Sequence, residues 1–211
     1  MRKLLASCML AMLASSANAA IWIIGDDDGY GVGIADNATH NFDGFNANVD
    51  NRSDAEKAAT NGAQFTDTYS TAHPNFGPQP GTVATFTFTG LGSGWTQGSM
   101  WFDMADFQAS TFGAVLVTYN GIVQNWAFND GFPNTVVRFF NLGQDVIDSI
   151  NATGSLVVAI NRNQSIDFYG FDYALLSDRR GEDGIRIPEP GSLALIALGL
   201  AGLAGLRRRR T

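Results

Sequence analysis

The chain has 211 residues, of which 45% are hydrophobic, and this is enough for one domain with a buried core. Residues 20–187 carry 19 of the 20 acidic side chains and 7 of the 13 basic ones, a net charge of −12. This charge repels nucleic acid and anionic lipid, and it therefore argues against both as partners.

The first 19 residues have the three parts of a secretory signal peptide. Residues 2–3 are basic, and residues 4–13 are mainly apolar. The small residues expected around the cleavage site are Ala17, Ala19 and Ala20. The single cysteine, Cys8, lies inside this segment, so the exported chain has no disulfide and no thiolate metal ligand. We therefore predict export across the inner membrane and a mature domain over residues 20–177.

The mature chain opens with a predicted strand and a short helix. The apolar run 21–24 ends at Gly25 and predicts a strand, which a glycine-rich acidic loop follows. Ser53 and Glu56 are spaced as a capping box, which predicts the start of a helix. Asn61-Gly62 predicts the end of that helix. We expect this to be the one helix of the domain, and we read Asn151 to Gly154 as a turn.

From residue 82 onward the sequence alternates between apolar and polar residues, as half-buried strands do. Asn120-Gly121 is a strong hairpin signal between two of these strands. The further predicted strands cover residues 82–89, 99–107, 113–119, 122–128, 135–142, 155–161 and 166–176. About eight strands separated by turns predict an all-β, two-sheet β-sandwich, and we favour a jelly roll.

Three consecutive carboxylates, Asp26, Asp27 and Asp28, stand in the first glycine-rich loop. Calcium binds six to eight oxygens, and such loops supply carboxylates and carbonyls. The spacing is not that of an EF-hand, because no glutamate closes a twelve-residue loop. The alternative is an acidic turn that is simply solvated.

The predicted strands, together with the segment from Asp167 to Tyr173, resemble the galactose-binding-type jelly rolls of carbohydrate-binding modules. The resemblance implies a glycan-binding module with a structural Ca²⁺. It also implies that the first loop meets the last strand at the metal, which makes Asp172 a further candidate ligand.

Two tryptophans are candidate platforms for sugar rings. Trp95 follows Gly92-Ser93-Gly94, which predicts an exposed loop, and Trp126 stands among alternating residues. Trp101, inside an apolar strand, is expected in the core. Packing in the core is the alternative for each of them, because large aromatic residues dominate protein interiors.

No catalytic motif stands out. His40 and His73 have no zinc-ligand spacing, and nucleophile-elbow and phosphate-binding signatures are absent. Asp103 and Asp106 are expected on opposite faces of a strand. We therefore predict that the protein is not an enzyme.

The C-terminal segment combines a proline-rich motif, an apolar stretch and a basic end. Pro188-Glu189-Pro190 precedes the apolar residues 191–206, and Arg207, Arg208, Arg209 and Arg210 follow. The arginines are expected to stay on the cytoplasmic side. The apolar stretch reaches only about 24 Å as a helix, less than a stable span needs.

This segment resembles the PEP-CTERM sorting signal of Gram-negative bacteria, in the order of its three parts and in their terminal placement. The resemblance implies an exosortase as partner, which cuts near the motif and releases or transfers the protein outward. Residues 178–187 are a linker, and residues 188–211 form the signal. A permanent membrane anchor is the alternative.

The sequence thus predicts an exported protein that is held briefly at the membrane and then reaches the cell surface or the extracellular matrix. The resemblances imply a non-catalytic module associated with exopolysaccharide. A structural or adhesive protein without a specific ligand is the alternative.

Overall fold

The computed structural model describes residues 20–39, 49–60, 66–68, 70, 83–127, 129, 134–162 and 164–180. Residues 21–184 form one compact unit. The predicted signal peptide, the sorting motif, the apolar stretch and the arginine cluster lie outside the described residues, as does most of the linker. Within the described part of the chain, no helix has the length and apolarity needed to cross a membrane.

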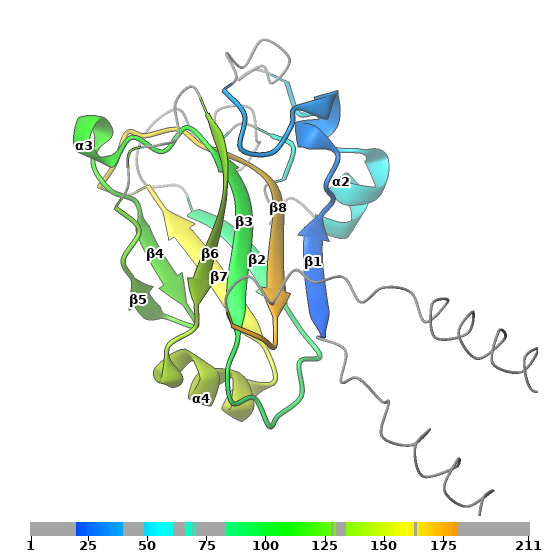
Figure 1. The fold of residues 1–211 in the computed structure, drawn as a ribbon, viewed down its shortest axis with the longest axis vertical. Coiled ribbons are helices and arrows are strands. Elements are labelled where there is room, and N and C mark those ends of the chain that lie inside the picture. Colours follow the sequence, from blue (N-terminus) through cyan, green and yellow to red (C-terminus); the bar gives the residue numbers. More distant parts are fainter. Residues whose placement is uncertain are drawn as a thin grey trace, which may run out of the picture. The chain divides into compact units, whose positions relative to one another are not determined.

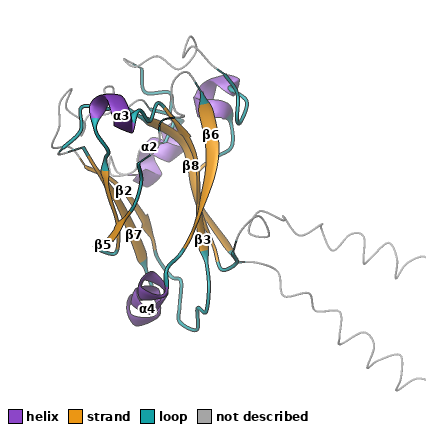
Figure 2. Cartoon of the chain, turned by 60° about the vertical axis from the view of Figure 1, so that its left-hand side comes forward, coloured by secondary structure: helices purple, strands orange, loops and turns teal. Residues whose placement is uncertain are grey.

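The described residues form two four-stranded sheets in which every neighbouring pair of strands is antiparallel (Figure 1). In sheet order, the first contains β1 (Ile21–Gly25), β8 (Gly170–Ser177), β3 (Ser99–Ala105) and β6 (Thr135–Asn141). The second contains β2 (Val83–Phe88), β7 (Leu156–Asn161), β4 (Leu116–Tyr119) and β5 (Ile122–Gln124). Figure 2 shows the two sheets facing each other as layers. The mostly-β, two-sheet prediction is confirmed.

The alternation in the sequence decides which side chains enter the space between the sheets. In β2, Ala84, Phe86 and Phe88 are buried, whereas Val83 and Thr87 are exposed. Phe86 meets Phe171 of the opposite sheet edge-on, with ring centroids 5.2 Å apart. Such aromatic pairs add about 1 kcal/mol beyond the burial of their area, so alternation and aromatic packing together fix the register of the layers.

The predicted hairpin between β4 and β5 is confirmed. Asn120 and Gly121 have φ angles of 48° and 81°, which the favoured two-residue hairpin turn requires at both positions. The Asn120 side chain also accepts a hydrogen bond from the Val157 N–H at 2.7 Å and donates one to the Ser155 carbonyl at 3.0 Å. The turn is therefore fastened to the neighbouring strand β7.

The early helix is confirmed, but the prediction of only one helix is wrong. In α2 (Asp54–Thr60), the Ser53 N–H donates to Glu56 Oε2, and the Glu56 N–H donates to Ser53 Oγ, as the capping box requires. A second helix, α4 (Gln144–Thr153), ends at Gly154, whose φ is 66°. Residues 151–153, predicted as part of a turn, are its last residues. A third, α3 (Ala109–Phe112), is a single turn.

The helices stand at the ends of the sandwich. α4 closes one end, and α2 and α3 lie at the other (Figures 1 and 2). The apolar side chains of α4 that enter the core are Val146, Ile147 and Ile150. Their spacing of three and four residues matches one face of a helix. The end away from α4 is left for the loops that carry the acidic residues.

Candidate metal centre

The antiparallel pairing of β1 with β8 brings the first acidic loop beside Asp172. Gly25, the last residue of β1, is paired with Tyr173, so the chain leaves β1 next to Asp172. Asp172 is fully buried and accepts hydrogen bonds from the N–H groups of Gly29 at 3.1 Å and Tyr30 at 2.8 Å. The first loop and the last strand, which the resemblance to jelly-roll modules implied as neighbours, are therefore in direct contact.

The loop continues into η1 (Gly29–Gly33), a single wide helical turn. Gly29 has a φ of 76°, and a Cβ there would lie 2.3 Å from the Ile34 nitrogen, so only glycine fits. Tyr30 has a φ of 61°, which is uncommon for a residue with a side chain. Its buried hydroxyl donates to Asp103 Oδ1 at 3.2 Å. Together with the N–H bonds to Asp172, this contact holds the strained turn on the outer side of β3 and β8.

Six aspartates around this turn form two groups of three. In each group, one oxygen from each carboxylate lies within 4.8 Å of the others. The Asp67 group consists of Asp26, Asp28 and Asp67. The Asp172 group consists of Asp27, Asp36 and Asp172. We call both groups together the acidic centre. Each combines one buried carboxylate with two exposed ones, so the centre reaches from the interior to the surface.

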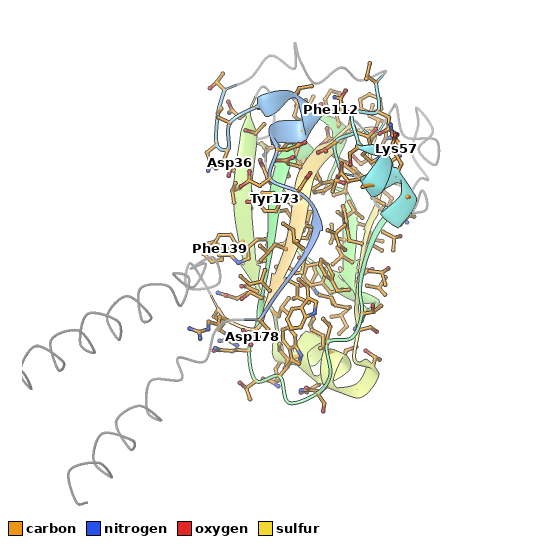
Figure 3. The ribbon with its side chains drawn as sticks, turned by 90° about the vertical axis from the view of Figure 1, so that its right-hand side faces the viewer. Asp36, Lys57, Phe112, Phe139, Tyr173 and Asp178 are labelled. Atoms are coloured by element: carbon orange, nitrogen blue, oxygen red, sulfur yellow. The ribbon has the colours of Figure 1, made fainter. Side chains whose placement is uncertain are left out.

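The sequence did not identify Asp36 and Asp67. Asp67 is held by backbone contacts, since its N–H donates to the Phe171 carbonyl at 2.8 Å and its carbonyl accepts from the Asn51 N–H at 2.9 Å. Asp36 lies close to Tyr173 of β8 (Figure 3), and its charge raises the pKa of that tyrosine after the larger effect of burial. Neither residue belongs to a local motif. Only the tertiary contacts place them in the centre.

The buried carboxyls of the centre resist ionisation. Burial, followed by the charge of Glu56 and then those of Asp28 and Asp172, raises the pKa of Asp67 to about 10. Burial, followed by the charges of Asp36 and Asp172, raises the pKa of Asp103 to about 8. The charges that act most strongly on these groups are those of other carboxylates. A bound cation reverses this penalty, because it favours the ionised form of each ligand.

Several of these oxygens have no donor. Both carboxyl oxygens of Asp67 and Oδ2 of Asp103 are buried and receive no N–H donor. The hydrogen bonds of these two carboxyls to Asp172 and to Asp36 each need a proton on one of the two partners, and the raised pKa values of Asp67 and Asp103 provide it. Once Asp67 is ionised, it has no donor among the described residues. Buried polar groups without partners are costly and rare. These oxygens are therefore the strongest structural indication that the centre takes a ligand.

A second buried pair, Asp106 and Asp167, lies away from the acidic centre. Asp167 accepts the Gln108 N–H at 2.7 Å, and one oxygen of each carboxyl has no partner. Burial, and then the charge of Asp167, raises the pKa of Asp106 to about 7. Asp106 thus faces Asp167 while Asp103 faces Tyr30, so the two carboxyls that the sequence placed three apart do not converge.

We expect Asp106→Asn to change how stability depends on pH. The folded state keeps a proton on Asp106 up to about pH 7, whereas the unfolded chain releases it near pH 4. The free energy of unfolding therefore falls as pH rises between these values, and the variant lacks this loss. Relative to wild type, the variant should gain about 2 kcal/mol more at pH 8 than at pH 5. Urea unfolding in constant Ca²⁺ measures the difference, and an equal effect at both pH values would refute the assignment.

The prediction that Trp95 is exposed is wrong, and Trp126 is also buried. Trp95 is 8% exposed and Trp126 is 3% exposed, and both belong to the core. Trp95 Nε1 donates to the Leu91 carbonyl at 3.0 Å, and its ring lies 5.3 Å from that of Trp22. Asn151 Oδ1 accepts the N–H groups of Gly94 and Trp95, which folds the loop inward. Neither tryptophan offers a sugar-stacking surface. Trp101, expected in the core, is also buried.

Trp95→Ala is consequently expected to act on stability. Removing a buried ring leaves a cavity and should lower the free energy of unfolding by about 3 kcal/mol. Val123→Ala is the matched control, because Val123 is 67% exposed and a surface substitution should change little. Urea unfolding of both variants tests this. A loss below about 1 kcal/mol for Trp95→Ala would contradict the core position.

Comparison with known proteins gives one family match and several structural likenesses. None of the curated proteins compared with the chain matches it significantly. Three solved structures are similar in fold to part of this chain. They are a family 35 carbohydrate binding module from Clostridium thermocellum, the CBM35 from Cellvibrio japonicus Abf62 and the Podospora anserina GH26-CBM35 beta-(1,4)-mannanase.

The sequence identities to these three proteins are 15%, 12% and 17%, and the TM-scores are 0.32, 0.30 and 0.30. The alignments cover 48%, 48% and 49% of this chain, and 74%, 69% and 21% of the other chains.

The family match is to the PEP-CTERM protein-sorting motif and covers residues 186–210. Its description agrees with the resemblance stated from Pro188-Glu189-Pro190 and the arginine cluster. The chain therefore carries a PEP-CTERM protein-sorting motif, which implies export, processing by an exosortase and localisation at the cell surface.

Proposed function

We propose that the protein is a non-catalytic surface module that binds Ca²⁺ at the acidic centre and, through it, associates with exopolysaccharide. The buried carboxyl of Asp67, which no N–H group contacts, carries this proposal, because only a bound cation would compensate its ionised form in that position. Before processing, the apolar stretch 191–206 holds the protein in the inner membrane. After processing, the module acts at the cell surface or in the matrix.

The chemistry of the donors favours Ca²⁺. All six side chains of the centre are carboxylates, which are hard oxygen ligands. Ca²⁺ takes six to eight oxygens in flexible geometry, whereas Mg²⁺ needs a near-ideal octahedron. The donors come from two irregular segments and one strand, an arrangement that suits the less demanding ion.

The charge of the module explains why a cation matters for polysaccharide. With a net charge of −12 over residues 20–187, the module repels acidic polysaccharide unless a cation lies between them. Asp26, Asp27, Asp28 and Asp36 are exposed, so ions held there face solvent. Hydroxyl or carboxylate oxygens of a polysaccharide can then complete the coordination.

We also propose that the sandwich is a jelly roll. The sheet orders β1-β8-β3-β6 and β2-β7-β4-β5 support this. The chain changes sheet at every connection except the β4–β5 hairpin. A jelly roll is likewise a double sheet of eight strands.

Polysaccharide retention with and without Ca²⁺ tests the function. Full-length protein in detergent is passed over immobilised polygalacturonate and over neutral dextran, in 2 mM Ca²⁺ or in chelator. We expect retention on polygalacturonate only with Ca²⁺, and at least a tenfold loss for Asp36→Asn. Asp148→Asn, an exposed carboxylate on α4 at the other end of the sandwich, is the matched control. Equal passage in both buffers would contradict the polysaccharide proposal.

A structural or adhesive role is the second candidate, and an apolar row supports it. The strand register places Ile23, Leu175, Trp101 and Phe139 side by side across β1, β8, β3 and β6. Ile23 is 50% exposed and Phe139 is 42% exposed. Failure to bind either polysaccharide, together with self-association that Phe139→Ser abolishes, would favour this role.

A further inference from the structure

We infer that the apolar row of Ile23, Leu175, Trp101 and Phe139 is a docking surface for the enzyme that processes the chain at its C-terminal motif. The partner offers apolar side chains to this row while its catalytic site acts on the motif. This inference rests on the processing of the chain by an exosortase. It adds the surface through which that enzyme binds the folded module.

The first and last strands place the start of the linker close to the apolar row. Ile21 of β1 is paired with Ser177, the last residue of β8. β1 therefore begins, and β8 ends, at the end of the sandwich that α4 closes, away from the acidic centre (Figure 1). The row crosses the sheet at the pair of Ile23 and Leu175, two residues further along each strand. This corresponds to a distance of about 7 Å.

Three hydrogen bonds fix the direction in which the chain leaves β8. Ser99 alternates with the core residue Met100, so its side chain lies on the outer face of the first sheet. Ser99 Oγ donates to the Arg179 carbonyl at 2.7 Å, and the Arg179 N–H donates to Ser177 Oγ at 3.2 Å. Trp101 Nε1, which belongs to the row itself, donates to Ser99 Oγ at 3.0 Å. The linker therefore begins on the same face of the sheet as the row.

The length of the linker limits how far from the row the enzyme can work. Pro188 stands nine positions after Arg179, and nine residues span at most about 32 Å when fully extended. This is about the diameter of one small domain. An enzyme that holds the motif in its catalytic site is therefore large enough to contact the row at the same time.

The row offers this enzyme apolar surface without charge. Its two ends, Ile23 and Phe139, are exposed, and the Phe139 ring packs against that of Trp101 with centroids 4.9 Å apart. The neighbouring residues across the four strands carry no charge either, and they are Ile21, Ser177, Ser99 and Asn141. The module around them has a net charge of −12 over residues 20–187. An apolar partner can thus cover this face without burying a carboxylate.

Processing kinetics test the inference. Full-length protein and exosortase are reconstituted together in liposomes, and initial cleavage rates are measured over a range of substrate densities. Phe139→Ser should raise the apparent KM at least threefold and leave kcat unchanged, because docking at the row contributes to binding and not to cleavage of the bond. Val123→Ser is the matched control, since it removes an exposed apolar side chain from β5 of the other sheet. It should be processed as wild type is.

Ile23→Ser, at the other end of the row, is a second variant with the same expected result, so the test does not depend on the folding of one protein. An unchanged KM in the folded row variants would overturn the inference and leave the role of the motif intact. A lower kcat at an unchanged KM would overturn it as well. Loss of self-association without any change in KM would assign the row to contacts between copies of this chain. Absence of processing in wild type would contradict the role of the motif and this inference together.

Discussion

Chelation of Ca²⁺ is expected to lower the thermal midpoint of the full-length protein by about 10 °C. A ligand that binds only the folded state stabilises it by about 4 kcal/mol at a concentration a thousandfold above its Kd. For a domain of this size, each kcal/mol corresponds to roughly 2–4 °C. The proposed physical cause is that burial, and then nearby carboxylates, raise the pKa values of Asp67 and Asp103, whereas a bound cation favours the ionised ligands. Thermal unfolding in 2 mM Ca²⁺ and in chelator measures the difference.

Two variants make this experiment specific. Asp67→Asn should keep the shape of the side chain but reduce the response to Ca²⁺ by at least half, because an amide cannot ionise to become a carboxylate ligand. Asp148→Asn changes an exposed carboxylate on α4 and should respond as wild type does. Identical midpoints of wild-type protein with and without Ca²⁺ would exclude a stabilising cation at the acidic centre.

Replacement of Pro188-Glu189-Pro190 by three alanines is expected to block processing almost completely. The substituted residues lie inside the segment 186–210 that matches the sorting motif. The apolar residues 191–206, which we propose hold the unprocessed chain in the inner membrane, are unchanged. Pulse-chase labelling and membrane fractionation in an exosortase-bearing host should show the longer form accumulating in the membrane fraction.

Glu182→Ala is the control for that experiment, because Glu182 precedes the matched segment. It should be processed at the wild-type rate. If the alanine variant were shortened and released as quickly as wild type, processing would not depend on the motif and its assigned role would be wrong.

The sequence predicted those features whose cause is local. The capping box of α2 and the Asn120-Gly121 hairpin depend on a few consecutive residues, and both formed as expected. Helix α4 was missed although Val146, Ile147 and Ile150 have helical spacing. Asn151 to Gly154 were read as a turn, whereas in the structure they are the end of the helix and its left-handed cap.

The candidate site could be predicted only in part, for a related reason. Asp26, Asp27 and Asp28 are visible because they are consecutive, but Asp36 and Asp67 reach the centre through contacts distant in sequence. The error at Trp95 has the same origin. A glycine-rich segment predicts an exposed loop, yet the Asn151 side chain, 56 residues away, fastens the loop with Trp95 inside. Local composition identifies a loop but not which side of it faces the core.

Anomalous X-ray diffraction from crystals grown with Ca²⁺ tests the central claim most directly. We expect anomalous density among the carboxylates of the acidic centre, next to Asp67. Well-ordered carboxylates without any anomalous peak at 10 mM Ca²⁺ would contradict it.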